Sequence, residues 1–170
     1  MKDNHITQEA PGLGQQEPID SLLMENATLE AWRICFLANI YAFPFYRELE
    51  KLFDITRPEW VVLFCLAHAE PLCAQDITLK SSVPKNSIIR GVNRLVKKGL
   101  INKKDDPDDG RRSLLTITRE GWKLYSLALP AAVSRKEKLI SPLSKQELAQ
   151  LNQLLLKMCS NITERLNDTD

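Results

Sequence analysis

The segment from Lys85 to Gly121 constrains the fold of this 170-residue chain more than any other part of the sequence. Apolar residues recur at helical spacing from Ile88 to Val96, and Gly99 follows them where a glycine commonly ends a helix. Beyond it, two short segments alternate apolar and polar residues as strands do, and the Asp-Pro-Asp-Asp-Gly sequence between them is typical of a turn. The predicted elements are a helix over about 84–98, strands over 100–104 and 113–118, and a further helix from about 119.

The charge of this segment indicates what it binds. Residues 85–112 contain nine basic and four acidic side chains, a net charge of +5, whereas the whole chain carries only +1. A nearly neutral protein that gathers its positive charge on one helix and one hairpin is suited to bind a polyanion. Arg and Asn side chains on such a helix match the base edges in the major groove of DNA. We therefore expect the helix to read double-stranded DNA and the basic hairpin to contact the same duplex.

Helical patterns occupy most of the remaining sequence. Thr56-Arg57-Pro58-Glu59 has the composition of a capping box and begins a helix that is almost entirely apolar. Cys73 takes the capping position of a short helix over about 74–80, which forms a helix-turn-helix with the helix over 84–98. Ser144 opens the last helix, whose apolar stripe needs a surface to pack against. These patterns predict a mainly α-helical chain.

A run of apolar, glycine and hairpin residues carries a resemblance to a known family. The residues are Leu95, Gly99, Leu100, Ile101, Asp109-Gly110-Arg111, Leu115-Thr116-Ile117-Thr118 and Gly121. Together they resemble the winged-helix signature of the MarR family of bacterial regulators, and Asn93-Arg94-Leu95 stands where that family usually has Asp-Arg-Leu. The resemblance covers about residues 31–167. It implies a winged helix-turn-helix homodimer that binds a palindromic operator, often as a repressor released by a small phenolic or lipophilic ligand or by thiol oxidation.

The resemblance also implies roles for individual residues. Family members contact base edges or phosphates from the first turn of the recognition helix, and Arg111 matches the wing arginine that enters the minor groove. Arg90 lies where it can read bases from the middle of the helix, and Arg112 is either a further backbone contact or a simply exposed charge. The expected DNA-binding residues are Lys85, Asn86, Ser87, Arg90, Arg111 and Arg112. Asp109 matches the aspartate that fixes the wing. Arg94 matches an arginine that supports the wing through an acidic partner, for which Asp109 is the candidate.

The first predicted helix, over about 28–52, is rich in aromatic residues. Pro44 lies inside its pattern and should kink or interrupt it. The apolar face of this helix is either a dimer or domain core, or part of a pocket for an aromatic effector, since ligand pockets are mostly apolar with a few polar groups. Such a pocket would lie where this helix, the helix after Thr56 and the helix after the wing meet. Its candidate lining residues are Trp32, Phe36, Tyr46, Phe64 and His68.

The four cysteines are widely spaced and lie in helical patterns, so thiols are expected rather than disulfides. Cys73, at a helix N-terminus, and Cys35 are the candidates for a thiol that senses oxidants, and a merely tolerated cysteine is the alternative at position 73. The spacing of Cys65, His68 and Cys73 matches no standard zinc site. No catalytic constellation stands out either. We therefore expect no metal, no cofactor and no enzyme activity.

The sequence also indicates where the protein resides. No apolar run reaches the roughly 18 residues that a bilayer-spanning helix needs, and the N-terminus lacks the apolar core of a signal peptide. We therefore expect a cytoplasmic protein without a membrane partner.

We thus predict a mainly α-helical fold, a winged helix-turn-helix with a two-stranded wing and a helical dimerisation region. The expected divisions are a flexible N-terminal arm (1–27), a dimerisation helix (28–55), the DNA-binding domain (56–118) and C-terminal dimerisation helices (119–170). The predicted function is that of a MarR-type transcriptional repressor that binds a pseudo-palindromic operator as a homodimer and is released by a small aromatic effector. Two alternatives stay open: a thiol-based redox-sensing DNA-binding regulator, and a protein-interaction module that does not bind DNA.

Overall fold

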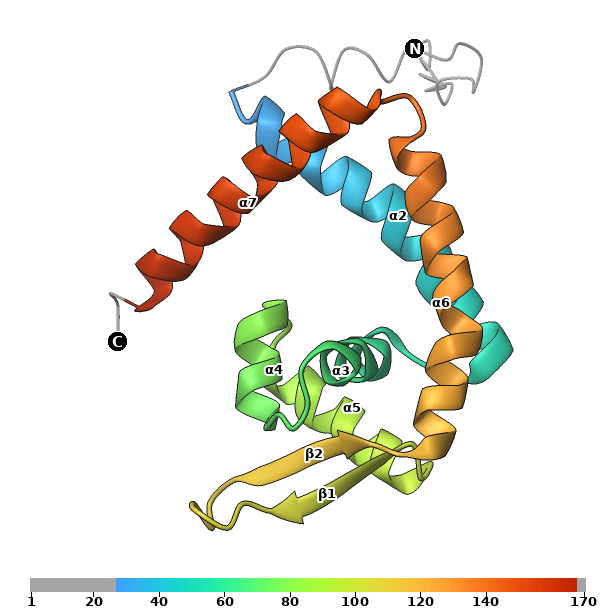
Figure 1. The fold of residues 1–170 in the computed structure, drawn as a ribbon, viewed down its shortest axis with the longest axis vertical. Helices are drawn as coiled ribbons and strands as arrows, with labels where there is room; N and C mark the ends of the chain where they lie inside the picture. The colour runs from blue at the N-terminus through green and yellow to red at the C-terminus, as the bar shows by residue number, and fades with distance from the viewer. Residues whose placement is uncertain (1–26, 168–170) are drawn as a thin grey trace, which may run out of the picture. The chain divides into compact units, whose positions relative to one another are not determined.

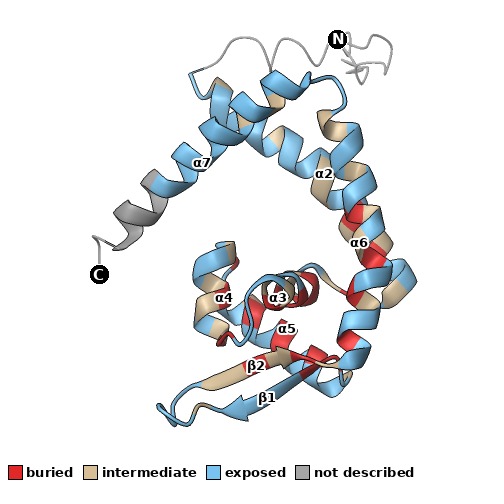
Figure 2. Ribbon diagram, in the orientation of Figure 1, coloured by how far each residue is buried: buried red, intermediate tan, exposed pale blue. Residues whose placement is uncertain are grey.

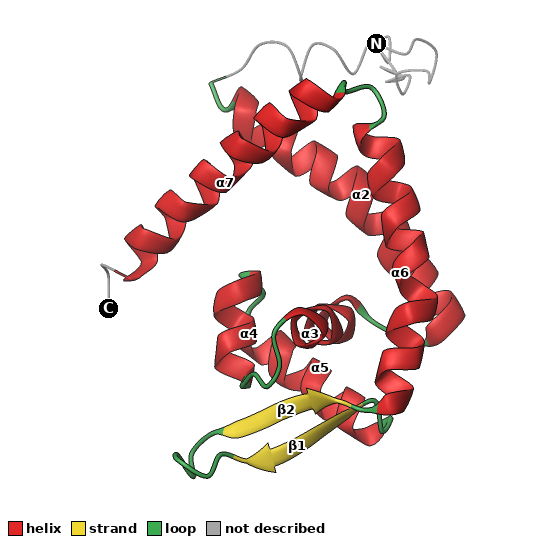
Figure 3. Ribbon diagram, in the orientation of Figure 1, coloured by secondary structure: helices red, strands yellow, loops and turns green. Residues whose placement is uncertain are grey.

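The structure, a computed structural model, describes residues 27–167. A hairpin of two strands interrupts a series of helices (Figure 1). The elements are α2 (Leu29–Phe53), α3 (Arg57–His68), α4 (Ala74–Ser81), α5 (Lys85–Lys97), β1 (Ile101–Asp105), β2 (Ser113–Ile117), α6 (Arg119–Ile140) and α7 (Lys145–Asn167). The predicted N-terminal arm, residues 1–27, lies outside the described residues except for its last residue. The prediction of a mainly α-helical fold with a two-stranded wing is confirmed (Figure 3).

The chain divides into two compact units, residues 1–38 and 39–170. The described part of the first unit contains the beginning of α2, whose side chains are mostly exposed. In the second unit, the helix continues through Pro44, so the interruption that the sequence allowed at this proline does not occur. No helix within residues 27–167 combines the length and the apolar character needed to cross a membrane.

The core of the second unit gathers the buried residues of α3, α5, the wing and the first turns of α6 (Figure 2). From α5 it receives Ile88, Val92 and Leu95, which repeat at helical spacing and are all buried. Val96 belongs to the same predicted stripe but is exposed, because it lies about 100° around the helix from Leu95. Removal of these apolar side chains from water holds α5 against α3 and the wing.

Local hydrogen bonds begin the helices where the sequence predicted. The main-chain N–H and the hydroxyl of Thr56 both donate to Glu59 Oε2, at 2.8 and 2.5 Å. The same two groups of Ser144 donate to Glu147 Oε2, at 2.8 and 2.7 Å. After α5, Gly99 adopts a φ of +68°, the left-handed conformation that ends many helices. The two capping boxes and the terminating glycine are therefore confirmed.

The wing is an antiparallel hairpin in which β1 and β2 pair along their full length. The outer edge of β2 is paired as well, because the main-chain groups of Leu72 and Leu115 exchange hydrogen bonds. At the base of the wing, Gly121 approaches β1 so closely that a Cβ would lie 2.1 Å from the main-chain oxygen of Leu100. Only glycine fits there without a shift of the backbone, so this residue fixes how α6 leaves the wing.

Candidate nucleic-acid interface

The helix-turn-helix consists of α4 and α5, joined by residues 82–84. Ser82 adopts a φ of +53°, which turns the chain sharply after α4. The Ser81 hydroxyl donates to the main-chain oxygen of Ile77 at 2.6 Å and accepts from the main-chain N–H of Val83 at 3.3 Å. Ile77 and Val83 are both buried, so the turn is anchored in the core. Hydrogen bonds and core packing together therefore hold the turn between the two helices.

The outer face of α5 carries mainly polar side chains, since Ile88, Val92 and Leu95 are the residues that face the core. Its exposed residues include Lys85, Asn86, Ile89, Arg90, Asn93 and Lys97. Ser87 is half-buried, and its hydroxyl accepts a hydrogen bond of 3.4 Å from Arg90 Nη2. Of the predicted residues on this helix, Lys85, Asn86 and Arg90 are exposed, whereas Ser87 is half-buried and bound to Arg90.

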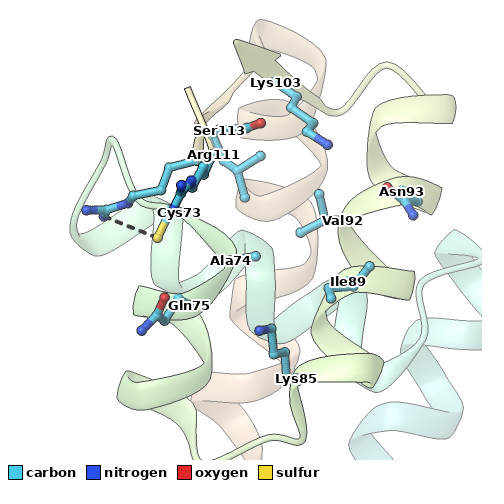
Figure 4. Close-up of a pocket in the computed structure, with 12 residues that line it drawn as sticks. Cys73, Ala74, Gln75, Lys85, Ile89, Val92, Asn93, Lys103, Arg111 and Ser113 are labelled. Carbon is cyan, nitrogen blue, oxygen red and sulfur yellow. Dashed lines mark hydrogen bonds between the residues drawn. The ribbon is translucent and has the colours of Figure 1, made fainter. Parts of the chain in front are cut away.

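A groove of about 240 Å³ lies between α5, the start of α4 and the wing (Figure 4). Four cationic residues line it: Lys85 from α5, Lys103 from β1, and Arg111 and Arg112 from the loop between the strands. Its lining residues are Cys73, Ala74, Gln75, Lys85, Ile89, Val92, Asn93, Lys103, Arg111, Arg112, Ser113 and Leu115. The fold thus brings residues that are 26 positions apart in sequence, Lys85 and Arg111, to one cationic surface.

The tip of the wing is organised by Asp109. Its Oδ1 accepts a hydrogen bond of 3.0 Å from the main-chain N–H of Arg111, and its main-chain oxygen accepts one of 2.9 Å from the main-chain N–H of Arg112. Within the described residues, no ion pair or hydrogen bond engages the guanidinium of Arg111. Asp109 therefore holds the turn from which Arg111 extends as an unpaired cation.

The guanidinium of Arg112, unlike that of Arg111, is engaged by other residues of the protein, which the sequence did not indicate. Its Nη2 lies 3.3 Å from Cys73 Sγ and 3.5 Å from Asp76 Oδ2, and its Nε lies 4.0 Å from Asp106 Oδ2. The thiol, together with the two carboxylates, raises the pKa of this guanidinium further above its usual range. Arg112 is thus not a simply exposed charge, and its role as a further backbone contact stays a prediction. Arg112 ties the wing to the N-terminus of α4.

The predicted partner of Arg94 was wrong. Its Nε lies 3.4 Å from Glu59 Oε1 and its Nη2 lies 3.8 Å from Asp54 Oδ1, so Arg94 pairs with the segment between α2 and α3 rather than with Asp109. The reason is the phase of the helix: Lys85 lies on the side of α5 that faces the wing, and Arg94 lies nine residues later, about half a turn around the axis. Arg94 therefore supports the recognition helix and not the wing.

Two exposed residues of α5 that line the groove, Ile89 and Asn93, were missed among the sequence candidates. Ile89 is 38% exposed on the wall of the groove, beside Asn93. An apolar side chain outside the buried stripe of α5 was a usable signal, since an isoleucine at such a position can contact a thymine methyl group. Asn93 carries no charge where the family usually has an aspartate, so it adds no repulsion toward phosphate.

The candidate effector residues lie in two places. Tyr46, Phe64 and His68 belong to an aromatic cluster around Trp60 and Tyr125, in which the Phe64 and His68 rings lie 4.3 Å apart and Trp60 stacks on Tyr125 at 5.3 Å. Burial raises the pKa of both Tyr46 and Tyr125, so their hydroxyls stay protonated. Trp32 and Phe36 lie on the first part of α2, in the other compact unit.

The two candidate redox thiols differ in access. Cys35 is exposed on α2, whereas Cys73 is only 4% exposed and is covered by the guanidinium of Arg112. Its main-chain N–H donates to Asp76 Oδ2 at 2.9 Å, so position 73 opens α4 through its backbone. A buried thiol in this place gives oxidants little access. The position of Cys73 favours a structural role at the junction of α4 and the wing.

Comparisons with known proteins match the region that contains the groove. A protein-family model described as the MarR family matches residues 55–113. The transcriptional regulator HosA of Escherichia coli O111:H- is 30% identical over 113 residues, which are 66% of this chain and 83% of that protein. The homoprotocatechuate degradative operon repressor of Escherichia coli is 21% identical over 114 residues, 67% of this chain and 77% of that protein.

The fold is also that of a solved regulator. The crystal structure of a MarR/EmrR family transcriptional regulator from Acinetobacter sp. ADP1 matches 79% of this chain and 95% of its own, with a TM-score of 0.71 and 25% identity. The similarity thus extends well beyond the helix-turn-helix and the wing.

Proposed function

The chain belongs to the MarR family of transcriptional regulators, and from this premise we propose that it is a repressor which binds a pseudo-palindromic operator as a homodimer. A homodimer that binds DNA is what the family resemblance of the sequence implies, and the match to the family model supports carrying this to the chain. Repression is supported by the relative that is named an operon repressor in Escherichia coli.

One observation carries the DNA-binding proposal: Lys85, Lys103 and the unpaired Arg111 converge on a groove beside the exposed face of α5. Cations on the side of a recognition helix that faces the wing can contact the phosphate backbone that borders the major groove. We assign base contacts to Asn86, Arg90 and the first turn of α5. Arg111 is assigned to the adjacent minor groove, where an inserted arginine is attracted by the negative potential.

The homodimer would place two such surfaces on one face of the DNA. The recognition helices would enter successive major grooves about 34–36 Å apart. We assign the dimer contacts to α2 and to the helices after the wing, in the divisions 28–55 and 119–170. Exposed apolar side chains on α7 support this assignment, because monomeric proteins rarely leave a long apolar stripe in water. They include Leu154, Leu155, Leu156 and Met158.

The test is selection of bound fragments from genomic DNA by the purified protein, repeated with Arg111→Ala. We expect a palindromic site that the wild type binds and the variant binds weakly. Arg57→Ala is the matched control, because Arg57 is an exposed arginine of α3 that does not line the groove and lies outside the divisions assigned to the dimer contacts. A site bound equally by all three proteins would refute the role of Arg111. Recovery of no site above non-specific background would refute DNA reading and favour a protein-interaction module.

We further propose that a small aromatic effector releases the repressor. The aromatic cluster of Tyr46, Phe64 and His68 supports this, since closely packed aromatic rings beside an imidazole can hold a planar ligand. An effector can shift the protein only if it binds the released conformation more tightly than the DNA-bound one. Titration of the operator complex with aromatic carboxylates, for the wild type and Phe64→Ala, tests the idea. Release that is equally effective in both proteins would exclude the cluster as the binding site.

A further inference from the structure

A fully buried carboxylate lies behind the recognition helix, on the side away from the groove. Glu59, in the first turn of α3, has no exposed surface. Its Oε2 accepts both hydrogen bonds from Thr56. Its Oε1 lies 2.9 Å from Lys98 Nζ and 3.4 Å from Arg94 Nε, and both distances are those of ion pairs. One carboxylate therefore caps α3 and also binds two cations of the α5 end.

Asp54 completes the network from the segment between α2 and α3. Lys98 donates to the main-chain oxygen of Asp54, and its Nζ lies 3.0 Å from Asp54 Oδ2. Arg94 Nη2 lies 3.8 Å from the other carboxylate oxygen. The backbone of Asp54 has a φ of +52°, an uncommon conformation for a residue other than glycine. We call these four residues, Asp54, Glu59, Arg94 and Lys98, the junction network.

The charges of the junction network balance, with two carboxylates against two cations. Burial by itself raises the pKa of Glu59, but hydrogen bonds from Thr56 and the ammonium of Lys98 outweigh it, and the pKa is lowered. Lys98 likewise lowers the pKa of Asp54. The network is therefore fully ionised near neutral pH. Its two cations are engaged within the protein, unlike Lys85 and Arg111 at the groove.

The junction network restricts the orientation of α5 against α3, which apolar packing alone would leave less defined. Apolar packing between α3 and α5 is favourable at many similar angles, because the hydrophobic effect is not directional. Ion pairs to a buried carboxylate are favourable only in a narrow geometry, since a displaced partner would leave a charge in the interior without compensation. Arg94 and Lys98 thus fix the C-terminal end of α5 to residues 54–59, the segment through which α5 is linked to α2.

We propose that the junction network is a positioning device which sets the distance between half-sites that the homodimer accepts. The inference rests on the proposed function, because it needs two recognition helices held in one dimer. If α5 could rotate against residues 54–59, each helix could follow a half-site displaced along the DNA. With the network intact, the two helices keep one separation. The residues of the network would then control spacing without touching any base.

The test compares Lys98→Met with Lys97→Met on three operators, the selected one and two in which a base pair is inserted or deleted between the half-sites. Each base pair changes the rotation between half-sites by about 35°. Lys98→Met keeps the apolar stem but removes the ion pairs, and we expect its preference for the native spacing to fall about tenfold, the effect of a charged hydrogen bond. Binding to an isolated half-site should change little.

Lys97 is the matched control because it is exposed on the last turn of α5 and has no place in the network. Lys97→Met should weaken binding to all three operators by the same factor. Asp54→Asn, at an exposed position, provides a second variant in case Lys98→Met does not fold, and should lower the spacing preference in the same direction. An unchanged spacing preference in a folded network variant would overturn the proposal. If the wild type binds none of the operators, the proposed function fails and the inference falls with it.

Discussion

Arg111 and Arg112 are neighbours with equal charge, and the structure predicts opposite consequences of removing them. In Arg111→Gln, a guanidinium that no described residue engages is lost from the wing tip. In Arg112→Gln, the lost guanidinium is one that already lies near Cys73, Asp76 and Asp106. We expect the first change to remove a DNA contact while leaving stability unchanged. The second should loosen the wing and alter the salt dependence of binding much less.

The size of the difference follows from counterion release. A cation that neutralises one phosphate contributes about 0.9 to the slope of log K against log salt concentration, so two wings of a homodimer contribute about 1.8. Over the fourfold range from about 50 to 200 mM salt, the advantage of the wild type over Arg111→Gln should therefore shrink about tenfold. For Arg112→Gln we expect less than about half of this slope change, because its charge is already balanced by two carboxylates.

Fluorescence anisotropy of a labelled operator at several salt concentrations measures both slopes, and thermal unfolding of the free protein measures stability. The melting temperature should fall for Arg112→Gln and stay at the wild-type value for Arg111→Gln. Equal slope changes in the two variants, or a larger change for Arg112→Gln, would show that the assignment of the two arginines is reversed or that neither neutralises a phosphate.

Three other predictions concern separate parts of the fold. Gly121→Ala should lower the free energy of unfolding by more than about 2 kcal/mol in urea titration, because the new Cβ would lie 2.1 Å from the Leu100 oxygen; a variant as stable as the wild type would contradict this. Ile89→Ser should weaken operator binding with an unchanged melting temperature, and the operators that it selects should lose a thymine preference in each half-site. The hydrogen bond from the Cys73 N–H is the largest cause of the lowered pKa of Asp76. Ionised Asp76 therefore stabilises the fold fully above the ordinary carboxyl pKa of 3.8, and this stabilisation is lost as the pH falls through the lower pKa of the folded state. Urea titrations down the acid range should therefore show a shallower loss of stability in Asp76→Asn, and curves of equal steepness would argue against this role.

Signals that act over a few residues were readable from the sequence. Thr56 and Glu59 lie three positions apart, and Ser144 and Glu147 repeat the arrangement, so each capping box is complete within one helical turn. Gly99 ends α5 for an equally local reason, its positive φ. The helix-turn-helix and the wing were predictable because their apolar periodicities and turn residues are adjacent in the chain.

Pairings between distant residues were not readable in the same way. Arg94 reaches Glu59 and Asp54, which precede it by 35 and 40 positions, and a motif match gives a residue a role without naming its partner. Arg112 illustrates a second reason. Arg111 lies in the turn that Asp109 holds and Arg112 follows it directly, and the sequence alone does not say which of the two adjacent arginines faces the protein. The choice depends on Asp76, which belongs to another helix.

The pairing of Leu72 with Leu115 has a consequence for how the chain tolerates changes in length. The connection between α3 and α4 runs beside β2 like a short additional strand, and Glu70 accepts a hydrogen bond of 2.8 Å from the main-chain N–H of Ile117 along the same edge. With one residue inserted between Glu70 and Leu72, the hydrogen bond of Glu70 to Ile117 and the pairing of Leu72 with Leu115 could not form in the same register. Side chains beyond the insertion would also turn to the opposite face. This connection, although it is a loop in sequence, should therefore be as intolerant of insertions as the interior of a sheet.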